Sequence, residues 1–252
     1  MTTRVFKFGG RAQAAPGLAS AIAAAAQRAQ VVVVHGGGDE VSAMQRRLGL
    51  EPQFIGGRRV TSEADLEVVR MLLSGSVNKR LVAQLLSAGA RAVGLSGEDA
   101  GMLTARVTDP TFGRVGRDVA ADVTLLRQLL AAGWLPVLSP LARDRESAEG
   151  LGLNVNGDDA ATAIAVALGA DELCFVADVD GVLEAGQRIP RLDPAGIRDL
   201  ADRGVAQGGM LAKLEAAVAA LEAGVGAIRI GTLELLHDPQ AGTTIVPAVP
   251  AS

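Results

Sequence analysis

Tyrosine is absent from this 252-residue chain, aromatic residues make up 2% of it, and Cys174 is the single cysteine. One cysteine excludes an intramolecular disulfide, and its place in an apolar run predicts a buried strand residue, because a reactive thiol needs a basic, partly exposed setting. With so few aromatic rings we expect a core of Ala, Val, Leu and Ile, for which a hydrophobic content of 49% is ample.

Several classes of protein are excluded by other absences. A net charge of −4 without interleaved aromatic and basic residues argues against nucleic-acid binding. No apolar run reaches the roughly 18–20 residues that span a membrane, and the N-terminus lacks the apolar stretch of a signal peptide, so we expect a soluble cytoplasmic protein. There is no P-loop, no Gly-x-Gly-x-x-Gly after the first strand, no metal-ligand spacing and no Ser–His–Asp arrangement.

Lysine is also scarce, since Lys7, Lys79 and Lys213 stand beside twenty-one arginines. A compact ammonium fits around one phosphate oxygen better than the wide guanidinium fork does. Lys7 precedes two glycines and Lys213 follows Gly-Gly-Met, and both settings suggest anion chemistry. The alternative for each lysine is an ordinary solvated surface position.

Short apolar runs alternate with Ala- and Leu-rich segments along the chain. Strands are predicted at residues 5–8, 31–34, 92–95, 135–138, 173–177 and 227–231, and helices at 18–30, 39–48, 64–88 (one or two), 121–132, 158–168 and 209–223. Residues 107–118 and 143–152 are interpreted as hairpins or loops. Continuous apolar strands between helices predict an α/β sandwich with a parallel sheet buried on both faces. We expect one domain, 1–252, with a seam near Ala170 that divides lobes 1–170 and 171–252.

Glycine clusters follow the first two predicted strands. Gly9-Gly10 and Gly36-Gly37-Gly38 would lie at the carboxyl edge of the sheet, where ligands bind in such folds. Glycine lets backbone N–H groups approach phosphate oxygens, and a following helix N-terminus adds a positive dipole end. The alternative is that these glycines merely form tight turns.

Three further segments carry polar groups. Asn154 to Asp159 precedes a predicted helix, where Asn156 or Asp158 would cap it or hold a ligand and a lysine. The segment 178–182 ends a strand and forms a plain turn or a nucleotide-facing loop. In the segment Arg58-Arg59, a guanidinium would clamp a carboxylate with two parallel hydrogen bonds, or be a solvated loop residue. We interpret His35 as a structural hydrogen-bonding residue rather than a base.

Taken together, these segments resemble the amino acid kinase family, and within it the N-acetylglutamate kinases of arginine biosynthesis. The resemblance covers nearly the whole chain. It is carried by residues 7–10 (KFGG), 34–38 (VHGGG), 57–61 (GRRVT), 78–81 (NKRL), 94–97 (GLSG), 154–158 (NVNGD), 178–182 (DVDGV) and 209–213 (GMLAK). Each motif alone is weak, but their order and spacing are specific.

The resemblance implies a three-layer αβα sandwich with a mainly parallel open sheet. It implies ATP-dependent phosphorylation of the side-chain carboxylate of N-acetyl-L-glutamate, with the substrate on the N-terminal lobe and ATP on the C-terminal lobe. The implied catalytic residues are Lys7, Lys213, Asp158 and Gly10; the substrate contacts are Gly37, Gly38, Arg59 and Asn154; the nucleotide contacts are Asp178, Val179, Asp180, Gly181, Val182, Leu183, Val205, Ala206 and Gln207.

The chemistry agrees with these roles. A carboxylate with a pKa near ~4 is already ionised at pH 7, so no general base is needed. Phosphoryl transfer depends mainly on positioning and charge stabilisation, which lysines, glycine N–H groups and Mg²⁺ carried by ATP would supply. We expect no protein carboxylate cage, because Mg²⁺ is often held mainly by phosphates and water.

Two departures from the family pattern, Arg58 and Asp159, lie near the expected substrate site. The alternatives are a kinase for aminoadipate or glutamate borne on a carrier protein, or a non-catalytic ligand sensor. Arginine-inhibited relatives resemble one another in an extra N-terminal helix that forms hexamers. Here the first predicted strand begins near the fourth residue, so we expect a homodimer that is insensitive to arginine. No role is predicted for Lys79.

Overall fold

A computed structural model describes residues 1–248 of the chain except Gly10 and Gly57. Its centre is an eight-stranded sheet in which β15 and β16 pair antiparallel and all other neighbours are parallel. The strands in spatial order are β14 (Arg191–Leu192), β16 (Thr243–Ile245), β15 (Ala227–Gly231), β11 (Glu172–Val176), β1 (Thr3–Phe8), β2 (Gln30–His35), β8 (Leu135–Ser139) and β5 (Ala92–Ser96). The predicted, mainly parallel sheet is confirmed.

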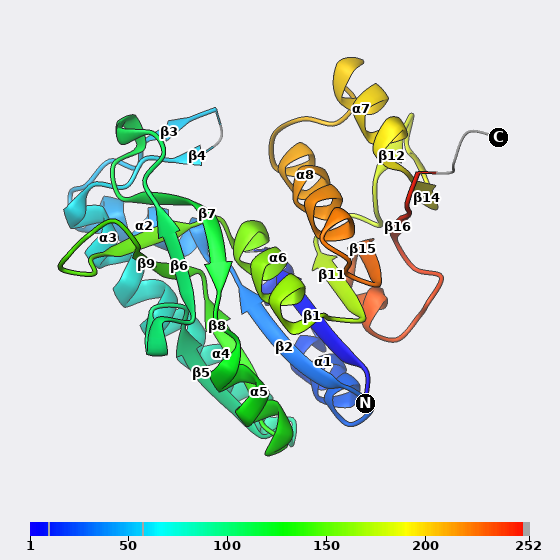
Figure 1. Ribbon diagram of the computed structural model, residues 1–252, viewed down its shortest axis with the longest axis horizontal. Coiled ribbons are helices and arrows are strands. Elements are labelled where there is room, and N and C mark those ends of the chain that lie inside the picture. Colours follow the sequence, from blue (N-terminus) through cyan, green and yellow to red (C-terminus); the bar gives the residue numbers. More distant parts are fainter. Residues whose placement is uncertain (10, 57, 249–252) are drawn as a thin grey trace.

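Helices cover both faces of this sheet, which gives three layers (Figure 1). One face packs on α1 (Leu18–Ala26), α4 (Asn78–Ser87) and the short helix η5 (Leu233–Leu236); the other packs on α5 (Thr124–Ala131), α6 (Gly157–Leu168) and α8 (Gly208–Glu222). The remaining helices are α2 (Gly38–Arg47), α3 (Glu63–Arg70) and α7 (Pro194–Asp202). No helix in the described part of the chain is long and apolar enough to cross a bilayer.

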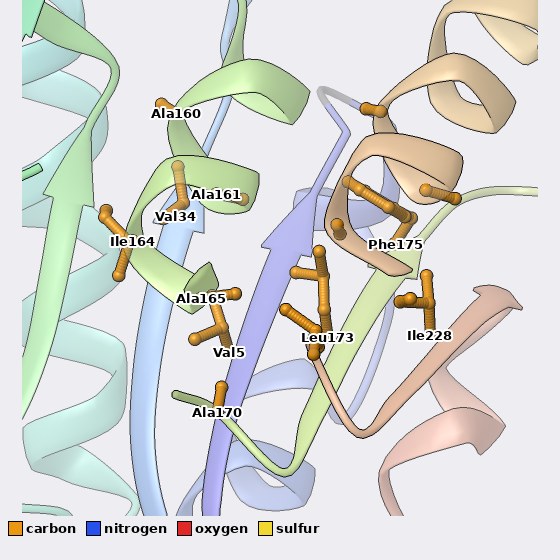
Figure 2. Close-up of a cluster of buried hydrophobic side chains, with 14 of the residues drawn as sticks. Val5, Val34, Ala160, Ala161, Ile164, Ala165, Ala170, Leu173, Phe175 and Ile228 are labelled. Atoms are coloured by element: carbon orange, nitrogen blue, oxygen red, sulfur yellow. The ribbon is translucent and has the colours of Figure 1, made fainter. Parts of the chain in front are cut away.

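The core consists mainly of small aliphatic side chains, as the composition predicts. On the α6 face, Val5, Leu173 and Ile228 of three neighbouring strands pack against Ile164 and the alanines of that helix (Figure 2). Small alanine side chains let helices lie close to the sheet, so a dense core forms with few rings. Phenylalanine still contributes, because Phe6, Phe8 and Phe175 are among the largest fully buried side chains.

A smaller sheet of four strands lies beside the main one and closes on itself. It contains β6 (Leu103–Arg106), β7 (Val115–Ala121), β9 (Leu141–Asp144) and β10 (Gly152–Val155). The segments 107–118 and 143–152 therefore belong to antiparallel hairpins, one of the two alternatives that the sequence allowed.

Several predicted boundaries were wrong. Residues 121–123 are not helical: β7 continues to Ala121 through its pairing with β6, and the Thr124 N–H donates to the Asp122 side chain where α5 begins. α1 ends at Ala26, and Gln30 already belongs to β2. The long helical segment 64–88 is α3, a π-helical turn η2 (Met71–Val77) and α4.

The sequence analysis missed short elements whose apolar pattern is too brief to detect. These are α7, the strand pairs β3 (Phe54–Ile55) with β4 (Arg58–Arg59) and β12 (Leu183–Glu184) with β13 (Gln187–Arg188), the edge strands β14 and β16, and the short 3₁₀ helices η1 (Arg11–Ala14), η3 (Asp99–Gly101), η4 (Pro110–Phe112) and η5. The expected lobe boundary near Ala170 stays a prediction. The main sheet continues across this boundary, because β11 pairs with β1 over five residues.

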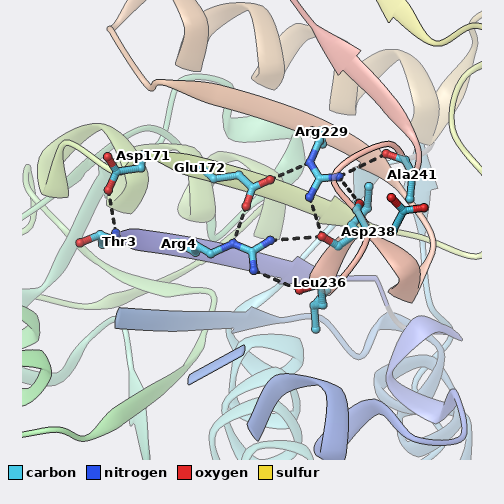
Figure 3. Close-up of polar contacts among 9 residues, drawn as sticks. Thr3, Arg4, Asp171, Glu172, Arg229, Leu236, Asp238 and Ala241 are labelled. Carbon is cyan, nitrogen blue, oxygen red and sulfur yellow. Dashed lines mark hydrogen bonds and ion pairs between the residues drawn. The ribbon is translucent and has the colours of Figure 1, made fainter. Parts of the chain in front are cut away.

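A polar network ties three central strands together near their amino-terminal ends (Figure 3). The carboxylate of Glu172 on β11 binds the guanidinium groups of Arg4 on β1 and Arg229 on β15. Both arginines also donate to backbone carbonyls at the end of η5, including Leu235 and Leu236. The network fixes η5 to the sheet edge opposite the glycine loops.

Candidate active site

Three adjacent strands end at one edge of the main sheet, and polar residues follow each of them. Phe8 of β1 pairs in register with His35 of β2 and Val176 of β11. The next residues along the chain are Gly9, Gly36 and Ala177, so Gly9 and the Gly36–Gly38 cluster lie at this edge, as expected.

Lys7 on β1 and Lys213 on α8 meet at the carboxylate of Asp158. Because side chains alternate along a strand, Lys7 points to the same side as Val5, toward α6. Its Nζ lies 2.8 Å from Asp158 Oδ1, and Lys213 Nζ lies 3.3 Å from Asp158 Oδ2. Lys7 and Asp158 are buried. The two lysines that the sequence singled out are thus joined through one carboxylate.

Burial lowers the pKa of Lys7, and the charge of Lys213 lowers it further, while the adjacent Asp158 raises it. Removing an ammonium from water favours its neutral form, so Lys7 depends on the Asp158 charge to stay protonated. The carboxylate between them also reduces the repulsion of the two lysines.

The start of α6 sets the position of Asp158. The side chain of Asn156 is the cap and accepts a hydrogen bond of 2.7 Å from the Asp158 N–H. This decides between the two caps that the sequence allowed. A Cβ on Gly157 would lie 3.0 Å from Lys7 Cε, so this glycine leaves room for the lysine stem.

A first cleft of about 260 Å³ lies between the start of α2, the β3–β4 hairpin and the small sheet. All four predicted substrate contacts line it: Gly37, Gly38, Arg59 and Asn154. Arg59 is held in place, because its Nη2 donates to the Gly38 carbonyl (2.8 Å) and to Ser42 Oγ (2.7 Å) and its Nη1 to Gln45. The Arg59 guanidinium also lies 4.8 Å from the centre of the Phe54 ring.

A second cleft of about 430 Å³ lies on the side of the C-terminal segments. Its lining includes Gly9, Asp178, Val179 and Lys213, and it shares Gly38 with the first cleft. Two concave sites thus meet at the start of α2, beside the Lys7–Asp158–Lys213 cluster. In the described part of the chain, no group of three His, Cys, Asp or Glu residues is placed to hold a metal ion.

Comparison with known proteins identifies the family to which a chain with this site belongs. The model of the amino acid kinase family matches residues 2–232. The chain belongs to the amino acid kinase family.

Several relatives of this amino acid kinase have assigned names. It is 46% identical over 211 residues to acetylglutamate kinase of Chloroflexus aurantiacus, covering 82% of each chain. It is 43% identical over 202 residues to acetylglutamate kinase of Bacillus subtilis, covering 80% of this chain and 77% of the other. The crystal structure of smu.665 from Streptococcus mutans UA159 has the same fold, with a TM-score of 0.85, 31% identity and coverage of 97% and 98%.

The predicted nucleotide contacts divide into distinct groups in this amino acid kinase. Asp178 and Val179 line the second cleft. Val182 and Ala206 are buried in the core, and the Val182 N–H donates to Thr243 Oγ1 at 2.9 Å. The remaining predicted nucleotide contacts are next to these residues in sequence. Gly181 is buried, and the exposed ones are Asp180, Leu183, Val205 and Gln207. Gly10 lies outside the described residues.

Arg117 is a lining residue of the first cleft that the sequence analysis did not identify. It comes from β7, which pairs with β10 so that Val115 lies opposite Asn154 and Gly116 opposite Val155, and Arg117 is the next residue of β7. Arg58, noted from the sequence as a departure, also lines this cleft. Burial raises the pKa of Asp159, against the opposing effect of Arg117. No local pattern marks Arg117, because only the strand pairing places it there.

Proposed function

We propose that this chain is an acetylglutamate kinase, which transfers the γ-phosphoryl group of ATP to the side-chain carboxylate of N-acetyl-L-glutamate in arginine biosynthesis. The observation that carries the proposal is the buried Asp158 carboxylate, held between Lys7 and Lys213, with its neighbour Gly157 lining the first cleft and Lys213 lining the second. Relatives 43–46% identical over most of the chain carry this name.

In the proposed mechanism the acceptor carboxylate attacks directly, because it is ionised at neutral pH and needs no base. Two anions must approach each other, so catalysis is mainly neutralisation and alignment. Lys7 and Lys213 would place their ammonium groups on the transferring phosphoryl oxygens. Asp158 would orient both ammonium groups and keep buried Lys7 protonated.

The first cleft would hold the acceptor. Arg59 would bind its α-carboxylate, since a guanidinium already fixed by Ser42 and Gln45 has little rotamer freedom left to lose. Asn154, whose Nδ2 donates to Thr61 Oγ1 at 3.1 Å, would offer its remaining amide groups to the substrate. The backbone N–H groups of Gly37 and Gly38 would face the reacting carboxylate and phosphoryl group.

The second cleft would hold ATP, with Lys213 and Gly9 toward its phosphates. The loop 178–183 and residues 205–207 would form the wall of the nucleotide pocket, largely through backbone groups where their side chains are buried. We include Mg²⁺ bound to the nucleotide phosphates, because magnesium usually enters kinase sites in this way.

A hydroxylamine trap of the acyl phosphate tests the proposal. The protein is assayed with ATP and N-acetylglutamate, glutamate, aspartate or carrier-free aminoadipate. We expect the highest kcat/KM with N-acetylglutamate. A far higher kcat/KM with another acid would overturn the substrate assignment, and no acyl phosphate with any acid would favour a ligand sensor.

Variants of the lysines test the mechanism separately. Lys7→Ala and Lys213→Ala should lower kcat at least ~100-fold, the scale for loss of one group that stabilises transition-state charge. Nucleotide affinity should change much less. A near-normal kcat in either variant would refute its role. The homodimer, the insensitivity to arginine and the cytoplasmic location stay predictions, of which light scattering and assays with added arginine check the first two.

A further inference from the structure

A chain of polar contacts, buried at His35 and Asn78 and reaching the surface at Lys79, lies behind the Gly36–Gly38 loop, on the face of the sheet away from Lys7. His35 ends β2 and Asn78 begins α4, and both are fully buried. Asn78 Nδ2 lies 3.1 Å from His35 Nε2 and donates to the Val137 carbonyl at 2.8 Å. Lys79 Nζ donates to Asn78 Oδ1 and to the Gly94 carbonyl, at 3.0 Å each.

These contacts determine which nitrogen of His35 carries the proton. The ammonium of Lys79 can only donate, so Asn78 Oδ1 accepts and Asn78 Nδ2 donates. His35 Nε2 must therefore accept, which places the ring proton on Nδ1. Burial lowers the pKa of His35 to about 4, so the ring is neutral at pH 7. The Nδ1–H then donates to the Gly36 carbonyl at 2.9 Å.

This hydrogen bond fixes the orientation of one peptide group in the site. The Gly36 carbonyl and the Gly37 N–H belong to the same planar trans peptide and point in opposite directions. With the carbonyl held toward His35, the Gly37 N–H is directed to the other side, where Gly36, Gly37 and Gly38 line the first cleft. Within the part of the chain that the structure describes, this N–H has no protein acceptor.

Packing supports the same arrangement from behind. Gly37 has a φ of 149°, and a Cβ there would lie 2.7 Å from Leu73 Cδ2 in the π-helical turn. A Cβ on Gly94 would lie 2.0 Å from Asn78 Oδ1, so this glycine leaves space for the polar chain. Three motifs that lie apart in the sequence thus support a single peptide group.

We infer that His35 is a positioning residue that, as the Nδ1–H tautomer selected by Asn78 and Lys79, locks the Gly36–Gly37 peptide and aims the Gly37 N–H at the transferring phosphoryl group. The inference rests on the proposed function. It assigns Lys79 a structural part in this chain of contacts rather than a contact with substrate.

Kinetics of three variants test the inference. His35→Leu removes the donor and should lower kcat about tenfold or more, with the KM values of ATP and acceptor within about threefold. His35→Asn should keep kcat within about threefold, because its amide can donate from near the Nδ1 position. Val33→Ala, a buried residue on the same strand and face, is the matched control: it should lower stability but leave kcat unchanged.

Three outcomes would overturn the inference: a kcat of His35→Leu within threefold of wild type, an equal loss in His35→Asn, or an equal loss in Val33→Ala. Activity is compared with whichever acceptor the wild type uses. Absence of N-acetylglutamate turnover by the wild type therefore counts against the proposed function and not against the role of His35.

A spectroscopic test needs no substrate. The chain has two histidines, so ring ¹⁵N shifts of labelled protein can be assigned with His237→Gln. We expect His35 to be neutral with the proton on Nδ1 at pH 7. A proton on Nε2, or a doubly protonated ring, would overturn the inference.

Discussion

Asp158→Asn keeps the size of the side chain and removes the charge that lies between two ammonium groups. At the observed separations of 2.8 and 3.3 Å, a dielectric constant of about 20 gives each attraction a magnitude of roughly 5–6 kcal/mol before solvation is counted. Breaking a buried ion pair by removing one partner typically costs about 3–5 kcal/mol. We therefore expect the free energy of unfolding to fall by about 3–5 kcal/mol.

Urea unfolding at pH 7 measures this loss, and a second substitution tests its cause. Lys7→Met in the Asp158→Asn background removes the buried charge left without a partner, so the double variant should be more stable than the single one, although both lack activity. Glu215→Gln, an exposed carboxylate on α8, is the control and should stay within about 0.5 kcal/mol of wild type. If Asp158→Asn lies within 1 kcal/mol of wild type, or if the double variant is no more stable, the electrostatic reasoning is wrong.

Three further predictions concern other parts of the molecule. Arg59→Lys should raise the acceptor KM about tenfold or more and leave the ATP KM nearly unchanged in initial-rate assays, because an ammonium cannot replace the bidentate fork; an unchanged acceptor KM would refute the contact. Because the pKa of His35 is about 4 in the fold against about 6.5 unfolded, its contribution is present above pH 6.5 and is lost as the pH falls toward 4. The free energy of unfolding should therefore be lower at pH 4.5 than at pH 7.5, and His35 should account for up to about 3 kcal/mol of this difference. That part of the difference should be absent in His35→Asn. Glu172→Gln should lower the free energy of unfolding by roughly 3 kcal/mol, because Arg4 and Arg229 lose their shared carboxylate, and should leave kcat unchanged. A Tm equal to that of the wild type would show that the network does not stabilise the fold.

Long apolar segments were the part of the fold that the sequence predicted well. β1 and β2 are buried on both faces, and such continuous runs are characteristic of central parallel strands. The helix preceding β8 was predicted to begin too early, because residues 121–132 form one segment rich in Ala and Leu, whereas the pairing of β7 with β6 keeps Ala121 in a strand. Local propensity cannot anticipate a partner strand that is distant in sequence.

For the candidate site, the sequence singles out some residues but gives no signal for others. Lys7, Lys213 and Asp158 stand out in the sequence because lysine is rare here and because their motifs have family-like spacing. Arg117 carries no such signal, since it reaches the first cleft only through the parallel pairing of β7 with β10. Lys79 lies in a recognisable motif, but its structural role follows only from its hydrogen bonds to Asn78 Oδ1 and the Gly94 carbonyl.

The sequence by itself determined the residue types and the order of elements: apolar strands, glycine loops at their carboxyl ends, and two rare lysines next to glycine-containing segments. These follow from local pattern, because side-chain chemistry and hydrophobic period act over a few neighbouring residues. Only the tertiary structure decided that Lys7 and Lys213, more than two hundred positions apart, share Asp158, and that a buried histidine selects the orientation of the Gly36–Gly37 peptide. Distances, burial and the protonated nitrogen depend on which distant segments pack together.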